Sequence, residues 1–187
     1  MDYNKYKDIL KERLNEKRYF HSLCVADEAK RLAILYGADA EEAFFAGLLH
    51  DITKNATENE QLQMFEEFGI IADSITKNSH KLWHAVTGAA YIKNILGITD
   101  EEVLSAVRYH TTAKRGMSLL EKILYLADFT SADRDYEDVD VMRKKVDISL
   151  DDAMRYALCY TIKELADKQV AIHPDTFEAY NEIMEEK

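Results

Sequence analysis

The chain has 187 residues, of which 47% are hydrophobic and 32% are charged, and its formal net charge is −11. This balance is typical of a single soluble globular domain with a sizeable core. An acidic surface repels a phosphate backbone, so we expect no nucleic-acid partner, although a local pocket of metal and arginine would still accept a small phosphorylated ligand. The sequence has no apolar run long enough to span a membrane and no signal-peptide pattern, which predicts a cytoplasmic protein with no membrane partner.

One proline and six glycines leave few obligatory helix breaks, so we predict an all-α fold. The expected architecture is a compact helical bundle in which residues 1–187 form one domain. Apolar periodicity and capping residues place helices, in chain order, over about residues 2–16, 18–36, 40–52, 57–68, 80–96, 100–110, 118–128, 149–168 and 174–186.

The predicted helix boundaries depend on a small set of capping residues. The expected helix starts are the N-caps Asp39, Thr99 and Ser149, the capping boxes Thr57 with Glu60 and Ser118 with Glu121, and Pro174 as a first helical residue. Gly37 and Gly97 are the expected helix ends. Cys24 and Cys159 lie in apolar helical stretches, so we interpret both as small buried hydrophobic residues.

Six polar side chains lie in or at the end of segments that we expect to be apolar and helical: His21, His50, Asp51, His84, His110 and Asp128. Burying them is costly unless something pairs with them, because charges and unsatisfied polar groups are unfavourable away from water. Imidazole nitrogens combined with carboxylate oxygens suit iron, zinc, manganese or cobalt. A metal centre is therefore the leading interpretation, and a purely structural helical protein ranks last.

The adjacent pair His50 and Asp51 is the sharpest single feature of the sequence. Neighbouring residues on a helix point about 100° apart, but at a helix end both can reach one ion. Taken alone, the pair favours a simpler interpretation in which His50 ends the helix and Asp51 is a solvated loop residue. His21 on an earlier helix and Asp128 on a later one shift the balance toward a metal centre.

Other polar residues near these motifs have simpler interpretations when taken alone. Arg134 suits a phosphate, but a surface salt bridge with a neighbouring acid of the loop (Asp133, Asp135 or Glu137) is the stronger reading of the residues by themselves. His173 precedes a proline and is interpreted as a helix cap. The remaining candidates are read as an exposed helix-start histidine, solvated loop charges and a core tryptophan: His80, Lys54, Lys114, Arg115 and Trp83.

The ordered pattern of these histidines and aspartates resembles the HD-domain superfamily of metal-dependent phosphohydrolases, over about residues 18–133. The segments RYFHSLCVADEAKRLA, AGLLHDITK, LWHAVTGA, VRYHTTA and ILYLADFTSADRDY, with the C-terminal QVAIHPDTFEAYN, are similar more narrowly to the YqeK family. Because these segments run from residue 18 into the C-terminal region, the resemblance covers nearly the whole chain. Members of that family split diadenosine tetraphosphate symmetrically into two ADP.

The resemblance implies roles for particular residues. The iron ligands would be His21, His50, Asp51 and Asp128, and catalytic roles fall to Asp51, His84 and His110. His84, His110 and Thr111 match positions that meet the nucleotide phosphates or a second metal. The full set of implied nucleotide-binding residues is His21, Asp51, His84, His110, Thr111, Asp128, Arg134 and a segment for the nucleoside end comprising Val170, Ala171, Ile172, His173, Pro174 and Asp175.

We therefore expect symmetrical hydrolysis of a dinucleoside polyphosphate by metal-activated water, with ADP as product. Iron is the first expectation, cobalt, manganese and zinc suit the same ligands, and one or two ions fit. The C-terminal helices, over residues 149–187, would complete the nucleotide pocket, and a homodimer is compatible with the sequence. Two alternatives stay open: another nucleotide phosphohydrolase, such as a nucleotidase or alarmone hydrolase, and a nucleotide sensor without turnover.

Overall fold

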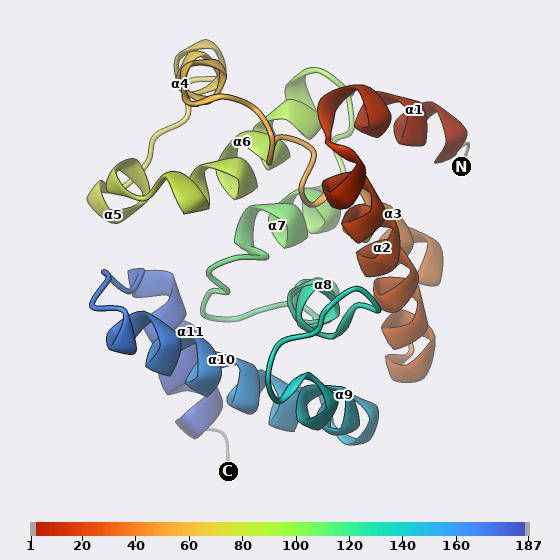
Figure 1. The fold of residues 1–187 in the computed structure, drawn as a ribbon, viewed down its shortest axis with the longest axis vertical. Coiled ribbons are helices and arrows are strands. Elements are labelled where there is room, and N and C mark those ends of the chain that lie inside the picture. The colour runs from red at the N-terminus through yellow and green to blue at the C-terminus, as the bar shows by residue number, and fades with distance from the viewer. Residues whose placement is uncertain (1–2, 186–187) are drawn as a thin grey trace.

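The computed structural model describes residues 3–185, which form eleven α-helices and, within that range, no β-strand. The helices are α1 (Tyr3–Arg13), α2 (Glu16–Tyr36), α3 (Ala40–Leu49), α4 (Glu58–Glu67), α5 (Ser74–Asn78), α6 (His80–Asn94), α7 (Glu101–Tyr109), α8 (Leu119–Thr130), α9 (Val139–Ile148), α10 (Leu150–Asp167) and α11 (Pro174–Glu185). In Figure 1, α7 and α8 lie in the middle of the bundle, with α2 and α3 on one side and α10 and α11 on the other. The all-α prediction is confirmed. None of the described helices is long and apolar enough to cross a membrane.

Most predicted helix boundaries agree with the structure because the capping residues act locally. The Asp39 side chain accepts hydrogen bonds from two backbone N–H groups at the start of α3, and both predicted capping boxes are present, at α4 and α8. Gly37 ends α2 in the left-handed conformation, with φ of 76°. The predicted start at residue 2 and end at residue 186 lie outside the described residues.

Two sequence predictions about local structure are wrong, and two helices were not predicted. The N-cap of α7 is Asp100, whose carboxylate accepts from two backbone N–H groups, and not Thr99. Helices α5 and α9 were not predicted: α5 has only five residues, and α9 follows Asp138, which makes no side-chain cap. Cys24 is buried as expected, but Cys159 is exposed, because α10 buries the preceding Leu158 and the next residue points about 100° away.

Helices α2 and α3 pack unusually closely, and Gly47 makes this possible. A Cβ atom added at Gly47 would lie 2.8 Å from the Cα of Ala26 and 3.0 Å from the carbonyl oxygen of Val25. The backbone of α2 therefore fills the space beside Gly47, one turn before His50. The close approach brings the histidine of α2 toward the end of α3.

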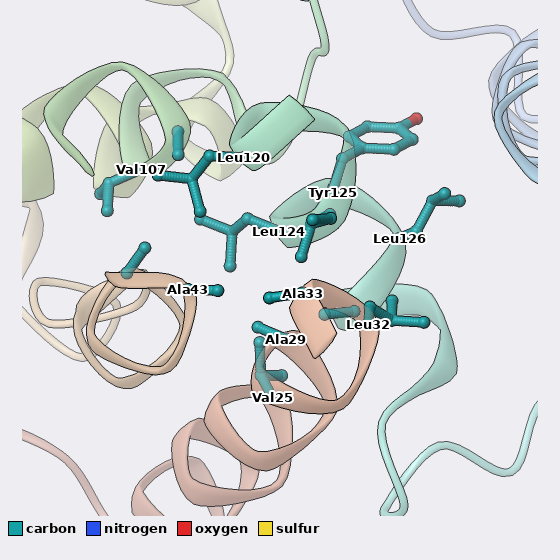
Figure 2. Close-up of a cluster of buried hydrophobic side chains, with 14 of the residues drawn as sticks. Val25, Ala29, Leu32, Ala33, Ala43, Val107, Leu120, Leu124, Tyr125 and Leu126 are labelled. Carbon is teal, nitrogen blue, oxygen red and sulfur yellow. The ribbon is translucent and has the colours of Figure 1, made fainter. Parts of the chain in front are cut away.

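The core is continuous, and α8 runs through its centre, in contact with α2, α3, α7, α9 and α10. Figure 2 shows side chains of α2 and α3 facing those of α7 and α8, including Val25, Ala29, Leu32, Ala33, Ala43, Val107, Leu120, Leu124, Tyr125 and Leu126. Most of the residues in this cluster are fully buried. Such a packed core holds the ends of these helices in fixed positions, which is the condition for a precise polar site.

Candidate metal centre

All six predicted polar side chains meet in one place, although they come from five helices. The contributing positions are His21 on α2, His50 and Asp51 directly after α3, His84 on α6, His110 directly after α7, and Asp128 on α8. Three overlapping triads each have ligand atoms within 4.8 Å of one another: His21–His50–Asp51, His50–His110–Asp128 and Asp51–His84–His110. Five of the six side chains are buried, and Asp128 is partly exposed.

Three of the histidines hold one ring nitrogen in a hydrogen bond that leaves the other free to bind an ion. The Nδ1–H of His50 donates to the carbonyl of Gly47, and that of His110 donates to the carbonyl of Val107, both over 2.7 Å. In His21, Nδ1 lies 2.8 Å from Oδ2 of Asp133. An acceptor at Nδ1 fixes the tautomer and leaves the Nε2 lone pair facing the centre, as in metal-binding histidines.

The atoms that face the centre lack ordinary hydrogen bonds. Nε2 of His21, Nε2 of His50 and Oδ1 of Asp51 are buried and have no hydrogen-bond partner among the described residues. Oxygen atoms nevertheless lie close by, since Nε2 of His21 is 2.9 Å from Oδ1 of Asp128. Lone pairs and carboxylates that crowd together without sharing protons need a cation between them. The donor set, imidazole nitrogen with carboxylate oxygen, therefore fits a divalent metal ion.

Most pKa shifts in the centre favour the protonation states that bind metals, which are neutral imidazole and ionised carboxylate. Burial lowers the pKa of His84, and burial together with His50 and His84 lowers the pKa of His110 to about 3. Burial alone would raise the pKa of Asp51, but the neighbouring histidines outweigh it and hold that pKa well below its ordinary value. Burial alone would lower the pKa of His50, but the charge of Asp51 outweighs burial and raises that pKa. A bound cation would supply the positive charge that Asp51 attracts there.

Arg18 is a part of the site that sequence reasoning missed. Its Nη1 donates to Oδ2 of Asp51 over 2.7 Å, and the carboxylate is only 3% exposed. This bond satisfies one carboxylate oxygen and leaves Oδ1 turned toward the histidines, 3.2 Å from Nε2 of His84. Arg18 lies one turn before His21 on the same helix, and that spacing is the signal that would have indicated it.

The loop that follows α8 supplies two more partners. Arg134 donates through Nε to the carbonyl of Asp128 over 2.7 Å and through Nη2 to its carboxylate. The expected surface salt bridge between Arg134 and a loop acid is therefore wrong, because the backbone turns Arg134 back onto α8. Asp133, which was considered only as that partner, instead binds His21. Burial alone would raise the pKa of Asp128, but His21 and Arg134 outweigh burial and hold the pKa of Asp128 well below its ordinary value.

Lys54 also belongs to the site, against the expectation of a solvated loop charge. Its Nζ lies 3.2 Å and 3.1 Å from the two ring nitrogens of His84, and burial lowers its pKa. The other predicted loop charges stay outside: Lys114 pairs with Glu121, and Arg115 is exposed near Glu182. His80 is exposed and Trp83 is buried, as expected.

The C-terminal segment Val170–Asp175 lies near the site but does not join the histidine cluster. His173 is buried, and its Nε2 lies 3.0 Å from Oδ2 of Asp73, at the start of α5. Its Nδ1 accepts a hydrogen bond from the N–H of Asp175, so the predicted capping role is confirmed. Thr176 donates to the carbonyl of Thr112, which places the segment beside the loop that follows His110. Thr111 in that loop has a buried hydroxyl without a partner in the described part of the chain.

Comparison with known proteins agrees with this geometry. The model of the HD domain matches residues 18–133, the range that contains all six side chains. The chain belongs to the HD-domain family. This assignment confirms the resemblance that the sequence motifs indicated.

Two curated relatives of this HD-domain protein carry the same name, symmetrical bis(5'-nucleosyl)-tetraphosphatase. The protein of Halalkalibacterium halodurans is 37% identical, with 100% of each chain covered, and that of Bacillus subtilis is 36% identical, with 92% of each chain covered. A crystal structure from Clostridium acetobutylicum superimposes with a TM-score of 0.95 at 38% identity, covering 100% of this chain and 99% of the other. It is described as a predicted HD superfamily hydrolase involved in NAD metabolism.

Proposed function

We propose that this protein hydrolyses dinucleoside tetraphosphates symmetrically and releases two nucleoside diphosphates, with diadenosine tetraphosphate giving two ADP. The observation that carries the proposal is the set of unpaired buried ligand atoms beside two cationic side chains, Lys54 and Arg134. The names of relatives that match this chain over 92% or more of its length support the substrate class. The HD-domain match supports metal-dependent phosphohydrolysis.

His21, His50, Asp51 and Asp128 would hold the resident ion. A divalent ion held there would lower the pKa of water toward neutrality and polarise a phosphoryl oxygen. We propose iron as that ion, and the same donors suit cobalt, manganese or zinc. The triad Asp51–His84–His110 shares Asp51 with these ligands and would accept a second ion or the phosphate itself.

The remaining chemistry is assigned to side chains of the chain. Asp51 is ionised and held through Oδ2 by Arg18, and in addition to holding the ion its carboxylate would orient the attacking water. Arg134 would exchange part of its bond to Asp128 for phosphate oxygens, because its guanidinium presents several donors in a plane. Lys54 would bind the same tetraphosphate from the side of His84. Attack of the water oxygen on one inner phosphorus would break the bond from that phosphorus to the central bridging oxygen. The attacked half would become one ADP that carries the water oxygen, and the other half would leave as the second ADP with the bridging oxygen, while the protons of water pass to solvent.

Product analysis tests the proposal directly. Purified protein would be incubated with diadenosine tetraphosphate and added iron, cobalt or manganese, and the products separated by chromatography. We expect ADP alone from the wild type and from His80→Ala, which removes an exposed histidine outside the site. Asp128→Ala should abolish turnover and lower metal content. AMP with ATP as products, or intact substrate in every metal, would refute the proposal.

The same assay separates the related activities. Release of nucleoside or inorganic phosphate from a panel of mononucleotides would identify a nucleotidase, and cleavage of an alarmone would identify that class. Tight ADP binding without turnover would indicate a sensor.

Elemental analysis of protein purified without added metal would test whether the resident ion is iron. The cytoplasmic location and a homodimer stay predictions, which cell fractionation and light scattering would test.

A further inference from the structure

An aromatic cavity opens directly beside the metal centre. It has a volume of about 220 Å³ and is lined by Asp128, Phe129, Arg134, Tyr136, Tyr160 and Glu164. The three rings come from α8, the following loop and α10. The Tyr136 and Tyr160 rings have centroids 5.5 Å apart at 44°, and Phe129 meets Tyr160 edge-on at 6.3 Å. A second cavity shares Tyr160 and Glu164 as lining residues, so the hollow continues along α10.

The position of the cavity, against the metal centre, suits a group that is attached to the cleaved phosphates. Asp128 and Arg134 belong both to the cavity wall and to the metal centre, so the cavity adjoins the centre. The C-terminal segment that follows α10 does not line the cavity, since His173 binds Asp73 at the start of α5. A symmetrical cut leaves a nucleoside and two phosphates on each side of the central bond. The two nucleosides therefore need two separate places on either side of the centre.

The chemistry of the wall matches a nucleobase better than a phosphate. Arg134 is the only cationic side chain among the residues that line the cavity, and Glu164 on the opposite helix would repel a phosphate. The faces of aromatic rings stack on bases of any kind. The Tyr136 hydroxyl is buried and finds no hydrogen-bond partner in the described chain. Burial and the neighbouring Tyr160 raise the pKa of Tyr136 to about 12, which keeps this hydroxyl protonated as a donor.

We infer that the cavity formed by Phe129, Tyr136 and Tyr160 binds one nucleobase of the dinucleoside tetraphosphate. The inference rests on the proposed function and deepens it. The ring of Tyr160 would stack on the base, the Tyr136 hydroxyl would donate to a ring nitrogen or ribose oxygen, and Glu164 would accept from an exocyclic amino group. The other nucleoside would lie toward the C-terminal segment.

The test removes the stacking ring and compares ligands with two nucleosides and with one. Tyr160→Ala, Tyr136→Phe and a control, Tyr180→Ala, would be assayed with diadenosine tetraphosphate and with adenosine 5'-tetraphosphate. Tyr180 is a half-buried tyrosine of α11 outside the cavity. Calorimetry with an analogue that carries a methylene bridge at the central position would measure binding without turnover. Tyr160→Leu, which keeps much of the volume, replaces Tyr160→Ala if the smaller side chain prevents folding.

We expect Tyr160→Ala to weaken analogue binding by roughly 5- to 150-fold, the range for losing one base–aromatic stack. KM should rise while kcat stays near the wild-type value, and the preference for the dinucleoside over adenosine 5'-tetraphosphate should shrink. Tyr136→Phe should weaken binding less, and Tyr180→Ala should bind as the wild type does. Unchanged analogue binding in the Tyr160 variants, or equal losses on both substrates, would overturn the inference. If the wild type itself neither bound the analogue nor cleaved the substrate, the proposed function would fail instead.

Discussion

Replacement of Gly47 by alanine should disturb the metal centre through the packing of two helices, without touching a ligand. The added Cβ would meet the Cα of Ala26 at 2.8 Å, and ordinary contacts begin at 3.4 Å, so α2 and α3 must separate by about 0.6 Å. His21 lies on α2, and His50 follows α3. Metal–ligand distances tolerate only about 0.2 Å of error, so this separation should weaken metal binding.

Gly88→Ala provides a matched control on stability. Gly88 is also buried in a helix, but a Cβ added there meets its nearest neighbour, Oγ1 of Thr53, at an ordinary 3.5 Å. Both variants gain the same helix propensity, about 1 kcal/mol, which therefore cancels in the comparison. The remaining difference is the cost of overpacking, about 1–3 kcal/mol in the free energy of unfolding.

Urea denaturation of the metal-free proteins would measure that difference, and titration with cobalt followed by its absorbance would measure metal affinity. We expect Gly47→Ala to be the less stable variant and the weaker metal binder. Equal stability of the two variants would show that α2 can shift without cost. Normal metal affinity in a destabilised Gly47→Ala protein would refute the link between helix spacing and the centre.

Three further predictions follow from neighbours of the site. Arg18→Leu should lower metal affinity by about 10- to 100-fold, measured by competition with a chelator, because Asp51 loses the bond that orients it. Asp133→Asn should lower metal affinity by a similar factor, since the carboxylate that fixes the tautomer of His21 is lost. Burial alone would raise the pKa of Asp73, but hydrogen bonds with Thr76 and His173 outweigh burial and hold this pKa below its ordinary value of 3.8. Its stabilisation is therefore complete above about pH 4 and lost as the pH falls further, so Asp73→Asn should flatten the acid side of a pH–stability curve.

The helices could be predicted from the sequence because their signals are local. Capping boxes at Thr57 and Ser118 and the left-handed Gly37 mark boundaries within one or two residues. Helix α9 could not be predicted in this way, because Asp138 provides no side-chain cap. What holds α9 in place is its packing against α8 and α10, and such contacts are not visible in a local pattern.

The six polar side chains of the centre could also be predicted, because buried histidines and aspartates on apolar helices need a common partner. The hydrogen bonds that support these side chains could not be predicted from the sequence. Arg18 contacts Asp51 across 33 positions, and Asp133 contacts His21 across 112 positions. Such pairs depend on how α2, α3 and α8 cross. The family resemblance implied a nucleotide-binding role for Arg134, but the structure was needed to show that Arg134 binds Asp128 and not a loop acid.

The charges around the centre explain how a chain with a net charge of −11 would accept the anionic substrate of the proposed function. Three carboxylates, those of Asp51, Asp128 and Asp133, face three cations, those of Arg18, Lys54 and Arg134. The cluster is therefore close to neutral by itself, and a divalent ion would make it positive. The surrounding low-dielectric core strengthens that local charge, whereas the distant surface carboxylates are screened within about 10 Å by salt. Metal binding would thus convert the site from one that tolerates a tetraphosphate into one that attracts it.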